Sequence, residues 1–201
     1  MNSKFFSAKN VALLGILVAL VIVLQLFASA VPMFGVTLNF SLIPIAFAGI
    51  LLGALGGAIV GFICGLVVFI GTAVLGGEPF TAMLFQAHPI ILTVMCIGKT
   101  TVAGLVSGLV FKFLSKKKEF LAVCVSAIIL PIINTGIYML GIIIMKDTTA
   151  TALGMGASSA GAVFVAVFAL IWINFVLEMA VNTIFIPMIE RVVKAIKNLI
   201  K

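Results

Sequence analysis

Charged and reactive side chains are scarce in this sequence of 201 residues. Only 8% of the residues are charged, five residues are acidic and a single one is histidine. A soluble domain of this size carries far more polar residues, so the composition excludes a soluble fold. Catalysis would need a nucleophile with a nearby base, or paired metal ligands, and this composition offers little for either. We therefore expect a membrane protein that is not an enzyme.

Residues that could bind a metal or form disulfides are also scarce. The three cysteines, Cys64, Cys96 and Cys124, stand alone in apolar segments and show no ligand spacing, so we expect them to pack in the core. The one histidine, His88, directly precedes Pro89 and is better explained as a solvated residue or a helix cap than as a metal ligand. The sequence thus predicts no metal site and no cofactor.

Long apolar runs are what the sequence has in abundance. Hydrophobic residues make up 64% of the chain, and its length suits about six spans of ~20–25 residues with short loops. These runs predict an all-α integral membrane protein, a compact bundle of six transmembrane helices that forms a single domain over residues 1–201. Residues 80–88 fit a re-entrant or interfacial segment, and residues 146–159 fit a loop. The spans are expected at residues 11–30, 40–55, 58–75, 89–114, 120–145 and 160–187.

The positive charges mark one side of the membrane. The net charge is +7, and the basic residues cluster at the ends of the spans rather than in one patch. With the N-terminus inside, ten Lys and Arg residues face the cytoplasm and only Lys146 faces outward. Because positively charged loops stay in the cytoplasm, this predicts a multi-pass protein of a prokaryotic-type cell membrane with both termini cytoplasmic. Nucleic acid is not an expected partner.

Three spans carry a polar residue at nearly the same depth. Counting ~1.5 Å per residue from the outer ends of the spans puts Lys99 about 15 Å, Asn134 about 16 Å and Asn174 about 18 Å below the outer surface. Tyr138 lies one turn from Asn134 on the same helix face. Ionisable groups inside a membrane are costly and mark functional sites by default. The layer predicts a cavity for a small polar or anionic solute, with Lys99 as its positive charge.

A polar stripe follows one face of the last span, because Asn174, Glu178 and Asn182 are each four residues apart. By the same rise Glu178 lies about 24 Å deep, roughly two turns below Lys99, and Asn182 lies about 30 Å deep. Two interpretations stay open for Lys99: contact with a ligand, or a structural ion pair with Glu178. Asn182 lies near the inner boundary and is expected to be a packing residue.

The tripeptide Gly98-Lys99-Thr100 looks like the end of a phosphate-binding loop. That motif needs a further glycine five residues before Gly98, where Thr93 stands, and a solvated loop after a strand. Here the tripeptide lies inside an apolar helix. We therefore reject nucleotide binding by this chain.

Small residues form a smooth stripe on the first span. They recur at steps of four, three and four residues and are Ala8, Ala12, Gly15 and Ala19. Such a stripe lets two helix backbones approach closely. It serves either packing within the chain or docking onto the helix of a partner protein.

Together, these features resemble a known family. The features are six short spans, both ends inside, and the small-residue stripe. Three motifs add to them: Leu-Asn-Phe-Ser-Leu-Ile-Pro at 38–44, a glycine-rich hairpin at 49–65, and three lysines at 116–118. Over essentially its whole length the chain resembles the substrate-binding S components of energy-coupling factor (ECF) vitamin transporters. The missing nucleotide-binding motif agrees with this, because ATP hydrolysis in that family resides in separate subunits.

The resemblance implies a role and a set of partners. An S component captures a water-soluble vitamin from outside the cell and then associates with a transmembrane T component and two ATPase subunits. In that family the small-residue surface of the first helix contacts the T component, and Gly15 departs here from strict alanine. The loop between the first two spans, residues 31–39, gates the site. The expected ligand contacts are Asn39, Lys99, Asn134, Tyr138, Asn174 and Glu178.

The substrate is suggested by a short stretch after Pro131. Asn134-Thr135-Gly136 looks like members of the family assigned to pantothenate, and a carboxylate ligand would suit Lys99. Thiamin, riboflavin and biotin members match less well, while folate and queuosine precursors stay open. The alternative function is a self-contained, ion-coupled secondary transporter of a small polar or anionic metabolite, with Glu178 as the coupling site. Inverted repeats would favour that alternative, and none is evident between residues 1–100 and 101–201.

Overall fold

Uninterrupted helices dominate the structure, because a chain in lipid must satisfy its backbone hydrogen bonds within each segment. The computed structural model describes residues 7–30 and 40–200. Among these residues, five helices are long and apolar enough to cross a membrane. One of them, α3, is continued by a short π-helix, η1 (Ile70–Val74), and the two count as one span. They are α1 (Ala8–Ala30), α3 (Gly53–Phe69), α5 (Pro89–Leu114), α6 (Glu119–Ile144) and α8 (Ala160–Ile200).

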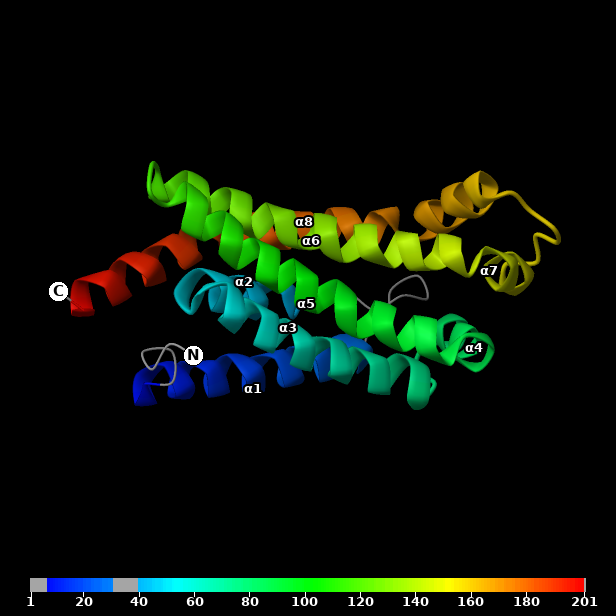
Figure 1. Cartoon of the computed structure of the whole chain (residues 1–201), viewed down its shortest axis with the longest axis horizontal. Coiled ribbons are helices and arrows are strands. Elements are labelled where there is room, and N and C mark those ends of the chain that lie inside the picture. Colours follow the sequence, from blue (N-terminus) through cyan, green and yellow to red (C-terminus); the bar gives the residue numbers. More distant parts are fainter. Residues whose placement is uncertain (1–6, 31–39, 201) are drawn as a thin grey trace.

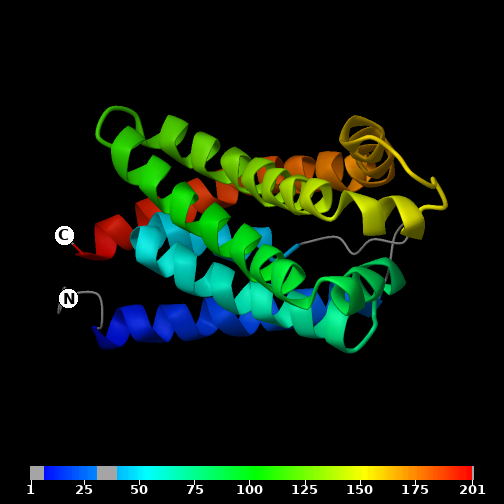
Figure 2. The same ribbon diagram turned by 45° about the vertical axis from the view of Figure 1, so that its right-hand side comes forward.

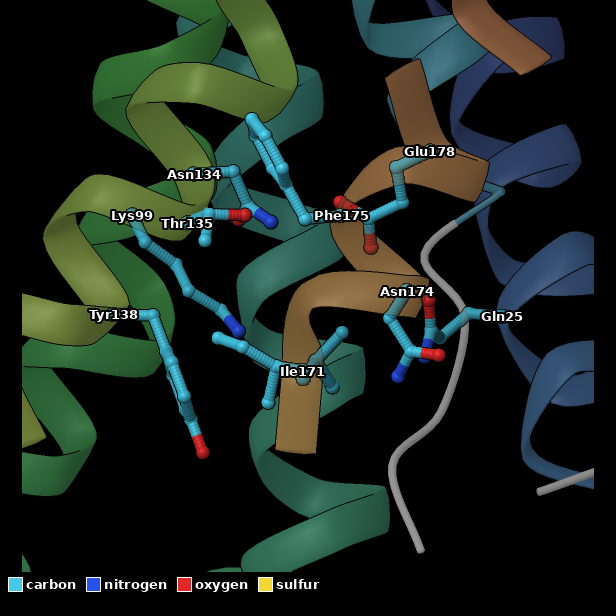
Figure 3. A pocket seen from close by; sticks show the side chains of 10 residues that line it. Gln25, Lys99, Asn134, Thr135, Tyr138, Ile171, Asn174, Phe175 and Glu178 are labelled. Atoms are coloured by element: carbon cyan, nitrogen blue, oxygen red, sulfur yellow. The ribbon is translucent and has the colours of Figure 1, made fainter. Parts of the chain in front are cut away.

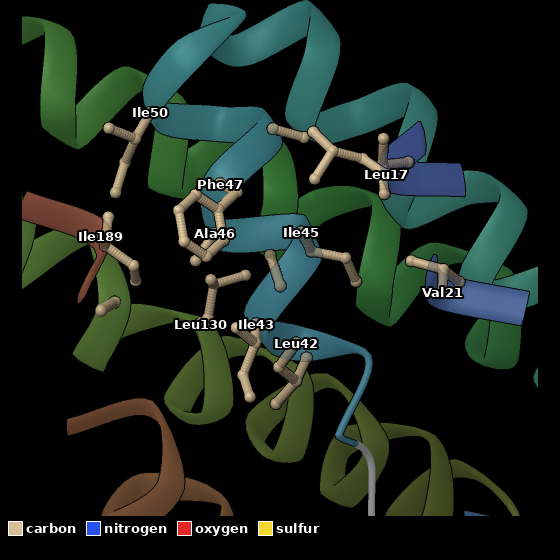
Figure 4. Close-up of a cluster of buried hydrophobic side chains, with 14 of the residues drawn as sticks. Leu17, Val21, Leu42, Ile43, Ile45, Ala46, Phe47, Ile50, Leu130 and Ile189 are labelled. Carbon is tan, nitrogen blue, oxygen red and sulfur yellow. The ribbon is translucent and has the colours of Figure 1, made fainter. Parts of the chain in front are cut away.

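The expected second span is shorter than the others. Helix α2 (Leu42–Leu51) has ten residues, which at ~1.5 Å per residue covers about half of a ~30 Å hydrocarbon core. Nine of its ten residues are buried in protein, and Figure 4 shows its side chains packed among α1, α6 and α8. The helix ends are therefore sheltered from lipid, which makes a half-length helix tolerable at membrane depth.

Two short helices lie between the long ones at the end of the bundle away from the C-terminus (Figure 1). Helix α4 (Pro79–Ala87) occupies the segment expected to be re-entrant or interfacial. Helix α7 (Lys146–Ala152) corrects the prediction of a loop over residues 146–159, since its first half is helical. His88 joins α4 to α5, but its Nε2 lies 2.9 Å from Thr148 Oγ1 of α7, so the side chain bridges two helices instead of capping one.

The described start of α1 and the end of α8 lie at the same end of the bundle, beside the turn between α5 and α6 (Figures 1 and 2). Five crossings would leave the two ends on opposite sides, and that the segment containing α2 makes the sixth passage stays a prediction. The same end carries the basic residues 112, 116–118, 191 and 194. That this end faces the cytoplasm stays a prediction from the charge distribution.

Glycines join α3 to α5 along a seam. A Cβ atom added to Gly57 would collide with the backbone carbonyl of Gly104, and one added to Gly61 would collide with that of Thr100. A Cβ on Gly65 would lie 2.6 Å from the Cα of Ile97. Only residues without a side chain allow such an approach, so the two backbones pack directly on each other.

Two apolar clusters fill the bundle, one in each half. The cluster near the termini contains Ala103 of α5 and Leu130 of α6, and the cluster near α4 and α7 contains Cys96 and Met139 of the same two helices. Cys64 also belongs to the first cluster, in agreement with the packing role expected for the cysteines. The residues between the clusters, at 97–102 on α5 and 131–138 on α6, include the predicted polar layer.

Candidate functional site

A cavity lies in the polar layer between the two apolar clusters. Helices α1, α3, α5, α6 and α8 all contribute to its lining, and Figure 3 shows the α5 and α6 side chains on one side and those of α8 and α1 on the other. Its lining residues are Gln25, Val68, Lys99, Asn134, Thr135, Tyr138, Ile171, Asn174, Phe175 and Glu178.

Five of the six predicted ligand contacts therefore meet at one place. Lys99 comes from α5, Asn134 and Tyr138 come from successive turns of α6, and Asn174 and Glu178 come from successive turns of α8. The four-residue spacing puts each of the last two pairs on one helix face. The sixth residue, Asn39, lies outside the described residues, as does the predicted gating loop.

Two carboxamides of the cavity, those of Asn134 and Asn174, carry buried polar atoms that the described part of the chain leaves without partners. Asn134 and Asn174 are each 5% exposed. Within residues 7–30 and 40–200, neither Oδ1 nor Nδ2 of Asn174 has a hydrogen-bond partner, and the same holds for Oδ1 of Asn134. Leaving a buried polar group unpaired costs about 1–3 kcal/mol, so the arrangement is expensive unless something else satisfies these atoms. The amides are thus ready to bond to a polar molecule in the cavity.

The ammonium of Lys99 lies 5.0 Å from the centroid of the Tyr138 ring. A cation over an aromatic face is stabilised electrostatically, and this contact helps to hold a positive charge inside the membrane. Lys99 and Tyr138 also line a second, smaller cavity on the side of α4, together with Glu78 and Thr81. The Thr81 hydroxyl donates to Glu78 Oε2 at 2.8 Å. Lys99 therefore stands between the main cavity and an acidic residue near the α4 end of the bundle.

The two lower members of the α8 stripe differ in surroundings. Glu178 is 9% exposed and lines the cavity, whereas Asn182 is buried below it and its Nδ2 donates to the backbone carbonyl of Glu178 at 2.9 Å. This placement agrees with the packing role expected for Asn182. Lys99 and Glu178 share one cavity, so both interpretations of Lys99, ligand contact and ion pair with Glu178, stay predictions.

Like Thr135, Gln25 is a polar lining residue that was not among the ligand contacts expected from the sequence. It is 2% exposed, and its Oε1 accepts a hydrogen bond from Ser41 Oγ at 3.2 Å. The same hydroxyl lies 3.2 Å from the backbone carbonyl of Val21. In the sequence, Gln25 stands out as the strongly polar residue of the first span, but a single sequence does not show which neighbouring helix it faces. Through Ser41, one side of the cavity is tied to both α1 and the start of α2.

The volume open to the centre of a water-sized sphere is about 60 Å³. At ~10–15 Å³ of such volume per molecule, this holds about four to six waters. A ligand larger than this would require the lining helices or side chains to move apart. Among the described residues, no group of three His, Cys, Asp or Glu side chains is placed to hold a metal ion.

Comparison with known proteins identifies the family. The family model described as "ECF transporter, substrate-specific component" matches residues 9–190. The chain belongs to this family. It is therefore a membrane-embedded, substrate-binding subunit of an ECF transporter rather than an enzyme. No curated protein and no solved structure matches the chain.

The small-residue stripe of this S component lies on the outside of the bundle. Ala8, Ala12, Gly15 and Ala19 are all exposed on α1, and a Cβ added to Gly15 would meet nothing within 4 Å. The opposite face of α1 contains Leu17 and is buried. The stripe therefore does not serve packing within the described part of the chain, and docking onto a partner helix stays a prediction.

Proposed function

We propose that this S component captures a small anionic, water-soluble vitamin from outside the cell, with pantothenate as the first candidate. The observation that supports this most directly is the buried cavity, in which the Lys99 ammonium faces carboxamide atoms that lack partners among the described residues. An ammonium suits a carboxylate, and Asn134 and Asn174 offer both donors and acceptors for amide and hydroxyl groups. Asn39, Tyr138 and Glu178 complete the proposed set of contacts.

Transport requires partners in this proposal. The T component docks on the exposed stripe of α1, and two ATPase subunits supply the energy. Both termini lie in the cytoplasm, and α2 completes a sixth passage of the chain through the cell membrane. Gln25 would link α1 to the ligand, and it lies on the face of α1 away from the stripe. Ser41, which bonds to Gln25, lies on the same side of α1.

The first test separates an S component from a self-contained transporter. Purified protein should bind pantothenate tightly, while vesicles that contain this chain alone should accumulate none. Addition of the T component and ATPases with ATP should start uptake. Accumulation driven by a proton or sodium gradient without those partners would instead establish the secondary transporter, with Glu178 as its coupling residue.

The second test concerns the site. Lys99→Ala should weaken pantothenate binding at least tenfold, because a hydrogen bond to a charged group contributes about 1.5–3 kcal/mol and each ~1.4 kcal/mol is a factor of ten. Lys112→Ala is the matched control, since Lys112 is an exposed residue at the far end of the same helix. Calorimetric titration of both variants gives the answer. Equal affinities for Lys99→Ala and wild type would remove Lys99 from the ligand contacts.

The third test concerns docking. Gly15→Leu places a large side chain on the stripe without disturbing the bundle, because the position is open. The variant should lose co-purification with the T component and keep its pantothenate affinity. Normal assembly of Gly15→Leu would refute the assignment of this surface.

A further inference from the structure

A second, apolar cavity lies between α6 and α8. Its volume, measured in the same way, is about 260 Å³, several times that of the polar cavity. Thr135 is the polar member of its lining; the other lining residues are Ile132, Gly136, Met139, Leu140, Ile143, Phe164, Phe168 and Phe175. We call this space the α6–α8 groove.

The groove is continuous with the surface of the bundle that faces lipid. Ile132 and Leu140, on either side of it along α6, are 43% and 61% exposed. On α8 the rings of Phe164 and Phe168 stack at a centroid distance of 6.0 Å and are about two-fifths exposed. Both helices are long and apolar enough to span a membrane, so we expect these side chains to contact hydrocarbon and the groove to open into it.

Gly136 creates much of this space. It is exposed on α6, and a Cβ atom added there would meet nothing within 4 Å. Within the described part of the chain, this glycine therefore makes no close backbone contact of the kind seen between α3 and α5. Its effect is to leave a depression between two helices that are lined elsewhere by Phe, Leu and Ile.

The groove shares a wall with the polar cavity. Thr135 and Phe175 line both spaces, one residue from α6 and the other from α8. Each directly neighbours a cavity amide in the sequence, Thr135 next to Asn134 and Phe175 next to Asn174. Whatever fills the groove therefore presses on the two residues that separate the ligand site from the membrane.

We propose that an acyl chain of a membrane phospholipid binds in the α6–α8 groove and supports the wall of the ligand cavity. Water does not fill so apolar a space, and an empty one forfeits the dispersion contacts of its lining. A flexible acyl chain is already present along this surface and can enter without leaving the lipid phase. The bound chain holds Thr135 and Phe175 against the cavity, so Asn134 and Asn174 keep the positions in which they meet the ligand.

Lipid retention tests the site without any vitamin. The full chain is purified in detergent, washed extensively and examined by native mass spectrometry for bound phospholipid. Wild type should retain about one phospholipid per chain, and Gly136→Leu, which fills the groove, should retain at least fivefold less. Gly98→Leu is the matched control, because Gly98 is an open helical glycine of α5 outside the groove. Equal retention in wild type and Gly136→Leu, or no lipid on wild type, would overturn the proposal.

Fluorescence gives a second measurement that does not depend on Gly136. Trp172 is the one tryptophan of the chain and is 48% exposed on α8, outside the groove lining. A double variant, Phe168→Trp with Trp172→Phe, moves the reporter into the groove. At a low fraction of phospholipid with brominated acyl chains in detergent, the indole of this variant should be quenched at least threefold more than Trp172 is in the wild type. Equal quenching would mean that the groove is ordinary lipid-facing surface.

The effect on the ligand site rests on the proposed function and is measured separately. Removal of lipid should weaken pantothenate binding by wild type at least fivefold, and added phospholipid should restore it. Gly136→Leu should bind equally well with and without lipid, because leucine takes the place of the chain. A lipid-independent affinity of wild type would sink the supporting role. If no pantothenate binds under any condition while lipid is retained, the choice of ligand fails and the acyl-chain site stands.

Discussion

The α3–α5 pair and the α6–α8 pair solve helix packing in opposite ways. Between α3 and α5 glycines remove the side chains, and backbone meets backbone at Gly57 and Gly104. Between α6 and α8 the packing leaves space unfilled, with the polar cavity on the inner side and the apolar groove beside Gly136 on the lipid side. The first pair is a fixed framework, and the second is where the molecule can hold something.

This difference between the two helix pairs shows which part of the bundle gives up stability in order to bind a ligand. A seam of backbone contacts has no free volume, so it cannot adjust to a guest but resists deformation. The α6–α8 pair carries buried amide atoms without partners in the described chain, and spaces that packing does not fill. These features lower stability locally, and the rigid α3–α5 pair allows the bundle to tolerate them.

The largest effect is expected in the seam. Gly104→Ala should lower the free energy of unfolding by about 1–3 kcal/mol, because the new Cβ would collide with the carbonyl of Gly57. The same substitution at Gly98, on the same helix but with nothing within 4 Å, should cause no loss. Thermal unfolding in detergent compares the two variants. Equal stability would show that the seam is looser than the backbone contacts imply.

The amides of the cavity should respond in the opposite direction. Asn174→Leu should raise the free energy of unfolding by about 1 kcal/mol, because it removes buried polar atoms that lack partners among the described residues. The same change should weaken pantothenate binding about tenfold. Asn182→Leu is the control, since Asn182 is also buried but lies outside the cavity lining. This variant should bind pantothenate with unchanged affinity. Loss of both stability and affinity in Asn174→Leu would mean that the amide is structural.

The smallest effect is expected at the junction of the two regions. Ser41→Ala removes a hydroxyl group that can donate its one proton either to Gln25 or to the carbonyl of Val21. The loss should lower the free energy of unfolding by about 0.5–1.5 kcal/mol. Affinity should fall by less than about threefold, because Gln25 loses one hydrogen bond but stays in the cavity. Ser107→Ala, which removes a buried bond to the carbonyl of Ser126, is the control and should cost similar stability with unchanged affinity. Identical affinities for the two variants would disconnect Gln25 from the ligand.

The sequence predicted the polar layer because depth in a membrane can be counted. A rise of ~1.5 Å per residue from each span end is enough to bring Lys99, Asn134 and Asn174 to one level. Which helix faces meet at that level depends on how the spans pack, and this is why Gln25, on α1, was not assigned. The α6–α8 groove escaped for the same reason, since nothing in the chain order shows that Gly136 faces open space while Gly104 faces a backbone.

Element boundaries followed the apolar runs where these were long. The spans at 89–114 and 120–145 agree closely with α5 and α6. The second span came out as ten helical residues where about sixteen were expected, because its length is limited by burial in protein and not by the thickness of the membrane. Helix α7 was missed because Thr and Gly around residues 146–159 favour a loop on propensity alone, whereas Thr149 and Ala150 are buried by packing.

The short helix α2 also constrains how the protein is made. A ten-residue helix is too short to leave the translocation machinery and rest alone in lipid, because its ends would expose unbonded backbone groups to hydrocarbon. It must wait at that machinery, or at the membrane surface, until α3 and later α5, α6 and α8 have been synthesised to enclose it. We therefore expect α2 to be fully enclosed only after α3, α5, α6 and α8 have been synthesised, because all four contact it.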